Sequence, residues 1–203
     1  MSIKAKRHLQ SQYPELSSLL DQVKTIPTLK RRDGPRPEAG VRVVVGQMLS
    51  SQAASTIYER VKKKTTEQQL SGSWLLDHDS LRQCGLSGSK ARTISEFAAH
   101  IGPESSALDH WYSLPADTLI TEIKGFRGMG DWTASIIALF YVGHEDVFPA
   151  GDGSLQKAIQ VIQGKKKGKR VQPFNYQMAS PYRSYLALYL WKLLDAGVLV
   201  NQK

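Results

Sequence analysis

Apolar residues recur every three or four positions along most of the chain, which predicts amphipathic helices rather than strands. The first clear case is VRVVVGQMLSSQAASTIYERV, residues 41–61. Its valines alone would suit a strand, but the helical spacing continues too far for one. We expect one helix here and then a second one that Ser51 caps. The apolar positions of the two helices are Val41, Val44, Val45, Met48 and Leu49, then Ala53, Ile57 and Val61.

Later segments carry the same spacing. Four of them have one apolar face each, and a serine precedes the first as its cap: SGSKARTISEFAAHI, PADTLITEIKGF, DWTASIIALF and GDGSLQKAIQVI. The segment SPYRSYLALYLWKLLDA, which starts at Ser180 and Pro181, is apolar nearly all round, so we expect a buried helix. The least regular stretches are KRRDGPRPEAG and QGKKKGKRVQPFN. The prediction is an all-α fold of roughly ten short helices.

Composition narrows the class of protein. A hydrophobic content of 41% and a charged content of 22% are ordinary for a soluble globular protein. No apolar run is long enough to span a bilayer, and the basic N-terminus lacks the apolar segment of a signal peptide. The single cysteine, Cys84, excludes an internal disulfide framework and a cysteine-ligated metal cluster, and it fits a reducing cytosol, nucleoid or nucleus.

The net charge of +9 is the first indication of a partner. Such an excess attracts polyanions, of which nucleic acid is the commonest. A basic surface without a specific ligand is the alternative at this point.

A glycine-rich turn, GFRGMGDWTASIIALF, places Gly128 and Gly130 between two predicted helices. A dinucleotide site needs a preceding strand and a third glycine at position 133, which is Thr133 here, and the Walker pattern is absent. A plain corner between helices would explain the glycines. The other interpretation is a helix–hairpin–helix, in which backbone N–H groups at the start of the second helix hold a DNA phosphate.

Four blocks in order resemble the helix–hairpin–helix DNA glycosylases, and among them the alkylpurine branch of 3-methyladenine DNA glycosylase II. The blocks are VVVGQMLSSQAASTIYERV, CGLSGSKARTISEFA, FRGMGDWTASIIALF followed by DVFPAGDGSLQKA, and PYRSYLALYLWK. Together they cover most of residues 40 to 195. The resemblance implies two helical lobes with the active-site cleft between them. One lobe would comprise residues 38–146, and the other residues 1–37 with 147–203.

The resemblance implies a catalytic aspartate after the second hairpin helix, and Asp152 matches that place. The residue would also suit the N-cap of the helix that follows, and the two roles are compatible because a carboxylate is favoured at a helix N-terminus. Cleavage of an N-glycosidic bond builds positive charge on the sugar, which a fixed anion stabilises. The anion could also orient the attacking water.

Other residues are carried over from the family in the same way. Trp132 matches a base-pocket residue, although the start of an apolar helix would equally place it in the core. Its ring face would suit a cationic, methylated purine. Lyases of the family have a lysine at this position, so we expect a monofunctional enzyme. Met48 and Gln52 match residues that fill the gap left by the extruded base; Met48 also fits a helix core, and Gln52 better fits an exposed wedge. Gly128, Gly130 and Thr133 are expected at the DNA backbone.

Three features distinguish the sequence from the branch. Ala179 stands where the branch usually has a tryptophan, so one aromatic wall of the pocket is expected to be missing. The lysine-rich run at 164–170 is either a solvated loop or a phosphate contact. We expect no counterpart of the N-terminal β domain of the longer bacterial enzyme.

The leading prediction is a monomeric, monofunctional glycosylase that hydrolyses alkylated purines from double-stranded DNA, in the bacterial cytoplasm or the eukaryotic nucleus. No metal, redox or organic cofactor is expected, except a monovalent cation between the hairpin and a phosphate. A glycosylase for deaminated or oxidised bases and a non-catalytic DNA-binding protein are the alternatives. Zinc deaminase chemistry is excluded because the C-x-x-C and H-x-E patterns are absent.

Overall fold

All regular structure in the described residues (2–34, 36–164 and 173–199) of this computed structural model is helical, which confirms the predicted all-α class. Ten α-helices are joined by turns and four short 3₁₀ segments, and α8 passes into a π-helical turn at Ala138–Val142. The α-helices are α1 Ser2–Gln12, α2 Ser17–Asp21, α3 Arg36–Gly46, α4 Ser51–Glu67, α5 His78–Gln83, α6 Gly88–Ile101, α7 Ala116–Lys124, α8 Asp131–Ile137, α9 Gly153–Gln163 and α10 Arg183–Asp195.

The chain divides into two compact units. One is continuous, Arg31–Val142, and the other joins Met1–Lys30 to Gly143–Lys203. The boundaries expected from the sequence, at residues 38 and 146, lie a few residues further along the chain.

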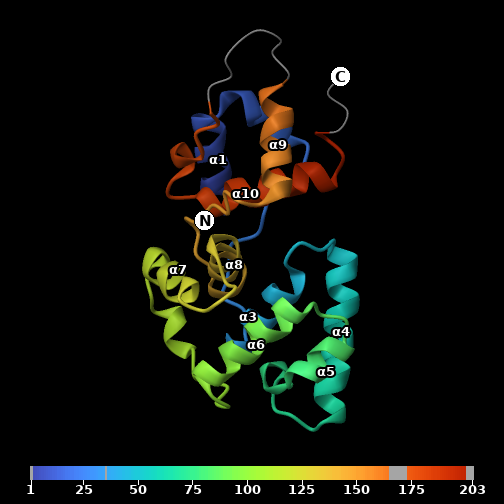
Figure 1. Cartoon of the computed structure of the whole chain (residues 1–203). Coiled ribbons are helices and arrows are strands. Elements are labelled where there is room, and N and C mark those ends of the chain that lie inside the picture. The colour runs from blue at the N-terminus through green and yellow to red at the C-terminus, as the bar shows by residue number, and fades with distance from the viewer. Residues whose placement is uncertain (1, 35, 165–172, 200–203) are drawn as a thin grey trace. The chain divides into compact units, whose positions relative to one another are not determined.

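The continuous unit is built around α3, which packs against α4, α6 and α8 (Figure 1). Its valines at 41, 43, 44 and 45 are all buried. Gly40 allows α6 to approach closely, because a Cβ at this position would lie 2.8 Å from the ring of Phe97. The apolar face predicted from the spacing of these valines is therefore the centre of the unit.

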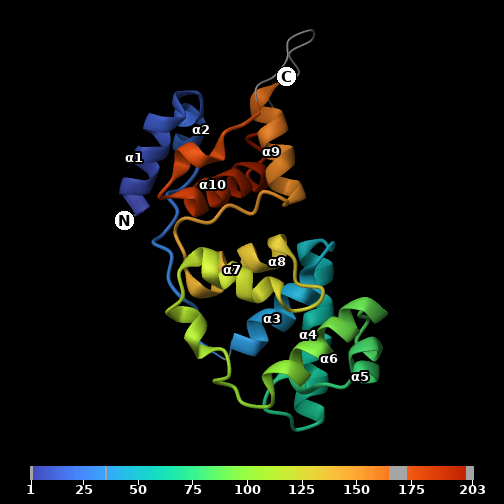
Figure 2. The same ribbon diagram turned by 60° about the vertical axis from the view of Figure 1, so that its left-hand side comes forward.

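The discontinuous unit is built around α10, which packs against α1, α2 and α9 (Figure 2). As predicted, most of α10 is buried, including Tyr185 and Tyr189. The two hydroxyl groups accept hydrogen bonds from the backbone N–H groups of Leu29 and Ile26, at 3.1 and 3.2 Å. These bonds tie the N-terminal segment to a helix more than 150 positions later in the chain.

Several predicted helix boundaries are wrong. Helix α3 ends at Gly46, so Met48 and Leu49 lie in the loop that follows rather than on the helix. Ser50, not Ser51, caps α4, with its hydroxyl accepting from the N–H of Ala53. Helix α10 begins at Arg183 instead of Ser180. Helix α3 begins inside the stretch interpreted as irregular, and most of the lysine-rich run lies outside the described residues.

The glycine turn joins α7 to α8, as Figure 2 shows. Gly128 has a φ of +77°, and a Cβ there would lie 2.1 Å from the hydroxyl oxygen of Thr93. Gly130 has a φ of −84° and begins α8 as its N-cap, and a Cβ there would meet nothing within 4 Å. Met129 between them is buried, while both glycines are exposed. The first glycine is thus required by the fold, and the second is not.

We expect Gly128→Ala to lower the free energy of unfolding by roughly 1–2 kcal/mol or more, because it combines a left-handed backbone with a steric clash. Gly130→Ala is the matched control and should unfold within about 0.5 kcal/mol of the unmodified protein. Urea unfolding followed by circular dichroism measures both. Equal losses for the two variants would contradict this account of the turn.

Candidate functional site

Asp152 lies immediately before α9 and caps it. Its Oδ1 accepts a hydrogen bond from the backbone N–H of Leu155 at 2.9 Å, which confirms the N-cap predicted from the sequence. The same oxygen accepts a second bond from the indole N–H of Trp191 on α10, at 3.0 Å. Because the two donors come from different helices, they fix the rotation of the carboxylate. Trp191 is a residue that the sequence did not single out.

The segment that leads to Asp152 is itself anchored on α10. Asp146 pairs with Arg183, with the guanidinium Nε 2.8 Å from Oδ1, and it accepts from the hydroxyl of Ser180 at 2.9 Å. Burial alone would raise the pKa of the Asp146 carboxyl, but the hydrogen bonds from Arg183 and Ser180 outweigh it and lower the pKa. The carboxylate therefore stays ionised and holds this segment at neutral pH.

Trp132 occupies the second position of α8 and is only partly buried. It lines a shallow hollow of about 240 Å³ together with apolar and aromatic side chains of α3, α8 and the π-helical turn. Arg32 and Arg42 supply the positive charge of this hollow. Tyr141 contributes no negative charge, because burial raises the pKa of its hydroxyl. Trp132 is thus a wall of a surface hollow and is not packed in the core.

Gln47 connects the end of α3 to the hairpin. Its side-chain N–H group donates to the carbonyl oxygen of Gly128 and to the hydroxyl of Thr133, both at 2.9 Å. Thr133 is 2% exposed, so its hydroxyl fastens α8 from inside the unit. Because its side chain is enclosed, a contact of Thr133 with DNA stays a prediction that concerns its backbone. No pattern in the sequence indicated Gln47.

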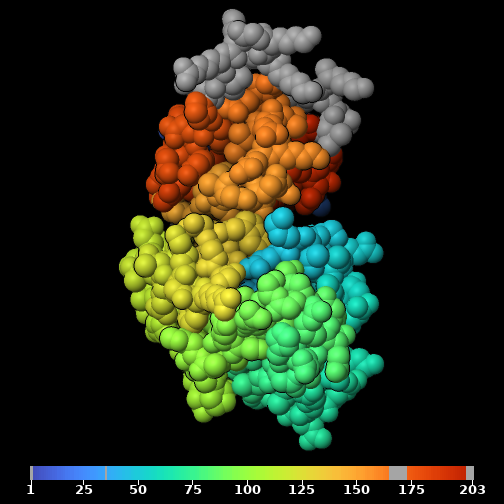
Figure 3. All heavy atoms as spheres, in the orientation of Figure 1, coloured from blue at the N-terminus to red at the C-terminus, as the bar shows by residue number. Residues whose placement is uncertain are grey.

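The loop between α3 and α4 presents Met48 and Leu49 to solvent. Met48 is 100% exposed and Leu49 is 39% exposed, and Gln52 is exposed in the first turn of α4. Figure 3 shows this part of the chain, in light blue and cyan, at the surface of the continuous unit. Met48 is not a core residue, which rules out the packing interpretation of its spacing. Its φ of +56° is in the left-handed region.

The predicted site residues are divided between the two compact units. Through Gln47, the continuous unit links the exposed Met48 loop to the glycine turn and the start of α8. Asp152 belongs to the discontinuous unit, as does Ala179. Ala179 is fully buried, and its side chain is only a methyl group where the resemblance implies a tryptophan.

Neither a group of metal ligands nor a membrane-spanning helix is found in the described residues. Among them, no three His, Cys, Asp or Glu side chains gather in a way that could hold a metal ion. Over the same part of the chain, every helix is too short or too polar to span a bilayer.

Comparison with known proteins places these features in a family. Residues 41–183 match the model of the HhH-GPD superfamily base excision DNA repair protein. The chain is 27% identical over 158 residues to DNA-3-methyladenine glycosylase 1 of Schizosaccharomyces pombe, covering 75% of this chain and 69% of that protein. It is 23% identical over 201 residues to the alkylbase DNA glycosidase-like protein mag2 of the same yeast, with 94% and 92% covered.

Solved structures agree with this match. A DNA-3-methyladenine glycosidase from Bacillus halodurans superposes with a TM-score of 0.73 at 25% identity, covering 98% of this chain and 91% of that one. The Schizosaccharomyces pombe 3-methyladenine DNA glycosylase Mag1, in complex with abasic DNA, has the same fold, with a TM-score of 0.71 at 23% identity over 93% and 95% of the two chains. Since the family model spans more than half of the sequence and includes both the glycine turn and Asp152, the chain belongs to the HhH-GPD superfamily of base excision DNA repair proteins.

Proposed function

We propose that this protein is a DNA glycosylase that removes alkylated purines of the 3-methyladenine type from double-stranded DNA. Membership of the base excision repair family supports this, as do the names of relatives in yeast and Bacillus. The observation that carries the proposal is the carboxylate of Asp152, which two helices hold in one orientation. A fixed anion is what a reaction that builds positive charge on a sugar requires.

In the proposed reaction, Asp152 is the catalytic residue. As the bond between C1′ and the purine nitrogen breaks, the sugar becomes oxocarbenium-like and the base leaves with the bonding electrons. The ionised carboxylate stabilises this cation and orients a water molecule, whose oxygen bonds to C1′ while its proton passes to the carboxylate and from there to solvent. The products are the free base and an abasic site. The base must first leave the helical stack, which favours a protein with an exposed wedge, and the exposure of Met48 and Gln52 supports this role for them.

The glycine turn is proposed to hold the DNA backbone. Gly128 and Gly130 are exposed, and the first intrahelical hydrogen bond of α8 is that from the N–H of Ala134 to the carbonyl oxygen of Gly130. In general, an α-helix leaves the N–H groups of its first turn without an acceptor inside that helix. They can meet a phosphate, or a monovalent cation can bridge the turn and the phosphate oxygen. Thr133 takes part only through its backbone.

Trp132 is proposed to form one wall of the base pocket, which agrees with its place in a surface hollow. Because this position holds an indole instead of an amine, no Schiff base can form there, and the enzyme should remove a base without cutting the strand.

The buried Ala179 favours a second candidate within the same chemistry, a glycosylase whose pocket accepts a different set of damaged bases. Release of bases from alkylated, deaminated and oxidised DNA would distinguish the two.

Asp152→Asn is the direct test of the reaction. Asparagine is also a good N-cap and can still accept from Trp191, so the variant should fold. We expect the single-turnover rate of base release from methylated duplex DNA to fall about 100-fold or more. Affinity for a duplex with an abasic analogue should be retained. If both proteins bind DNA but neither releases any damaged base, the non-catalytic DNA-binding alternative is correct.

Trp191→Phe tests whether the carboxylate must be held by both helices. Loss of one hydrogen bond of about 1 to 1.5 kcal/mol should slow base release roughly tenfold, with DNA affinity unchanged. Tyr189→Phe is the matched control, because it removes a hydrogen bond from the same helix that does not reach Asp152. Equal rates for the two variants would show that the orientation set by Trp191 does not matter.

Gly130→Ala tests the backbone contact separately from folding. The added methyl group meets nothing within the protein, but it would stand between the turn and a phosphate. DNA affinity measured by fluorescence anisotropy should fall severalfold, equally for damaged and undamaged duplexes, because phosphate contacts carry no sequence information. Unchanged affinity would mean that DNA does not approach this turn.

A further inference from the structure

We propose that Lys90 and Gln47 are positioning residues that fix Met48 for insertion into DNA and couple it to the hairpin that grips the backbone. The inference rests on the proposed function, because it takes Met48 as a wedge and the glycine turn as a phosphate contact. It concerns residues that neither the sequence patterns nor the family match singled out. All of them lie in the continuous unit.

Met48 is held in a costly state. Its φ of +56° is a conformation that side-chain-bearing residues rarely adopt, and its apolar side chain is 100% exposed. Neither property stabilises the fold. Backbone strain of this kind persists only where the surroundings fix it, and it is typical of functional positions. The loop therefore needs strong anchors on both sides of Met48.

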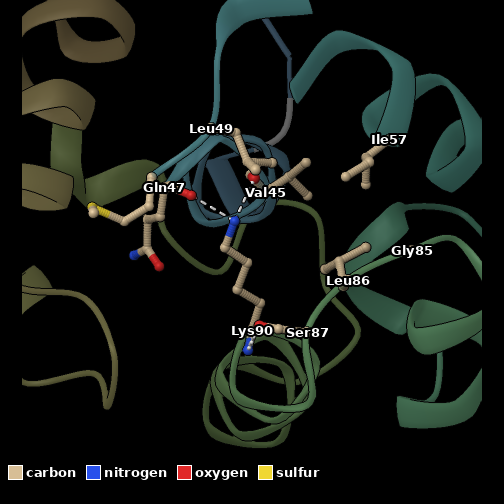
Figure 4. Close-up of a pocket in the computed structure, with 9 residues that line it drawn as sticks. Val45, Gln47, Leu49, Ile57, Gly85, Leu86, Ser87 and Lys90 are labelled. Atoms are coloured by element: carbon tan, nitrogen blue, oxygen red, sulfur yellow. Dashed lines mark hydrogen bonds between the residues drawn. The ribbon is translucent and has the colours of Figure 1, made fainter. Parts of the chain in front are cut away.

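Lys90 supplies the first anchor. Its ammonium group donates to the carbonyl oxygens of Val45 and Gln47, at 2.9 and 2.6 Å (Figure 4). These carbonyls lie at the C-terminal end of α3, where acceptors lack helical partners and a positive charge is favourable. Lys90 extends from the first turns of α6 and is partly buried, which lowers its pKa. Its charge is used inside the protein, unlike that of a surface lysine that meets phosphates.

Gln47 supplies the second anchor. The backbone carbonyl of Gln47 is bound by Lys90, while its side chain binds the carbonyl of Gly128 and the hydroxyl of Thr133. One residue thus joins the loop that carries Met48 to the glycine turn. Beyond Met48, the N–H of Leu49 donates to the carbonyl of Gly46, and Ser50 caps α4.

These contacts set the distance between Met48, the proposed wedge, and the glycine turn, the proposed phosphate contact. When the turn binds a phosphate, Met48 is already at the height and angle at which it can enter the base stack. A flexible loop would lose conformational entropy when it became ordered on the DNA. A loop that is already rigid avoids this loss, so insertion costs less free energy. A hollow of about 220 Å³ beside the loop is lined by Met48 itself together with Leu86 and Ile57.

Insertion can be measured without catalysis. The probe is a duplex that carries an abasic analogue next to 2-aminopurine, whose fluorescence rises when it is unstacked. At saturating protein, the unmodified chain should give a large rise and Met48→Ala a small one. We expect Lys90→Met and Gln47→Met each to reduce the rise at least twofold. Lys63→Met removes an exposed lysine of α4 and is the matched control, with an unchanged signal.

A cycle with Met48→Ala separates positioning from simple stabilisation. Lys90→Met and Met48→Ala should each slow base release about tenfold, and the double variant should be no slower than Met48→Ala alone. Additive losses, or a lower melting temperature with a full fluorescence rise at saturation, would overturn the proposal. Gln47→Met keeps the backbone carbonyl that Lys90 binds and removes only the side-chain bonds to Gly128 and Thr133. It therefore tests the coupling between the Met48 loop and the glycine turn even if Lys90→Met does not fold.

Different results would contradict the proposed catalytic role of Asp152 and the proposed positioning of Met48. If Met48→Ala gives the same rise as the unmodified chain, Met48 is not the wedge and the inference is wrong. If Asp152→Asn releases base at the normal rate, the catalytic proposal is wrong, while the fluorescence result still stands. A normal rise for both Lys90→Met and Gln47→Met would overturn the inference alone.

Discussion

The continuous unit depends on how the backbone carbonyl groups at the end of α3 obtain hydrogen-bond donors. A helix leaves its last carbonyls without partners, and burying them unpaired would cost free energy. Here Lys90 from α6 binds two of these carbonyls, and Gln47, which supplies one of them, extends to the glycine turn before α8. Three helices meet at this point through hydrogen bonds. The strained, exposed Met48 is tolerated because its neighbours are held so firmly.

A comparable arrangement in the discontinuous unit holds Asp152. The N-cap bond to Leu155 begins α9, and the bond from Trp191 ties the same oxygen to α10. A helix N-terminus favours a negative charge, so the structural role and the proposed chemical role require the same ionised form. For this reason an N-cap pattern in a sequence does not argue against catalysis. The structure uses one carboxylate for both purposes.

The positions where this chain differs from its family bear on what it accepts as substrate. We propose that Trp132, which stands where the resemblance implies a lysine in strand-cleaving members, leaves this position without the amine that strand cleavage needs. The buried Ala179 replaces a large ring by a methyl group.

Much of the fold follows from local patterns in the sequence. The apolar spacing predicted the helices, and local chemistry predicted the cap at Asp152, because the residues that make an N-cap lie three positions apart. Helices α1, α2 and α5 were not predicted. Boundaries were missed where the apolar spacing runs past the end of a helix, as at Met48 and Leu49, since a periodic pattern does not record where the backbone turns.

The long-range contacts were decided only by the tertiary structure. Gln47 meets Gly128 across 81 positions of the chain, Lys90 reaches Val45 across 45, and Trp191 reaches Asp152 across 39. The same holds for the burial of Thr133 and the exposure of Met48, which depend on which faces the helices present to one another. The sequence determined the helices, the glycine turn and the aspartate. Packing decided which polar groups meet, because a hydrogen bond between distant residues has no local signature in the chain.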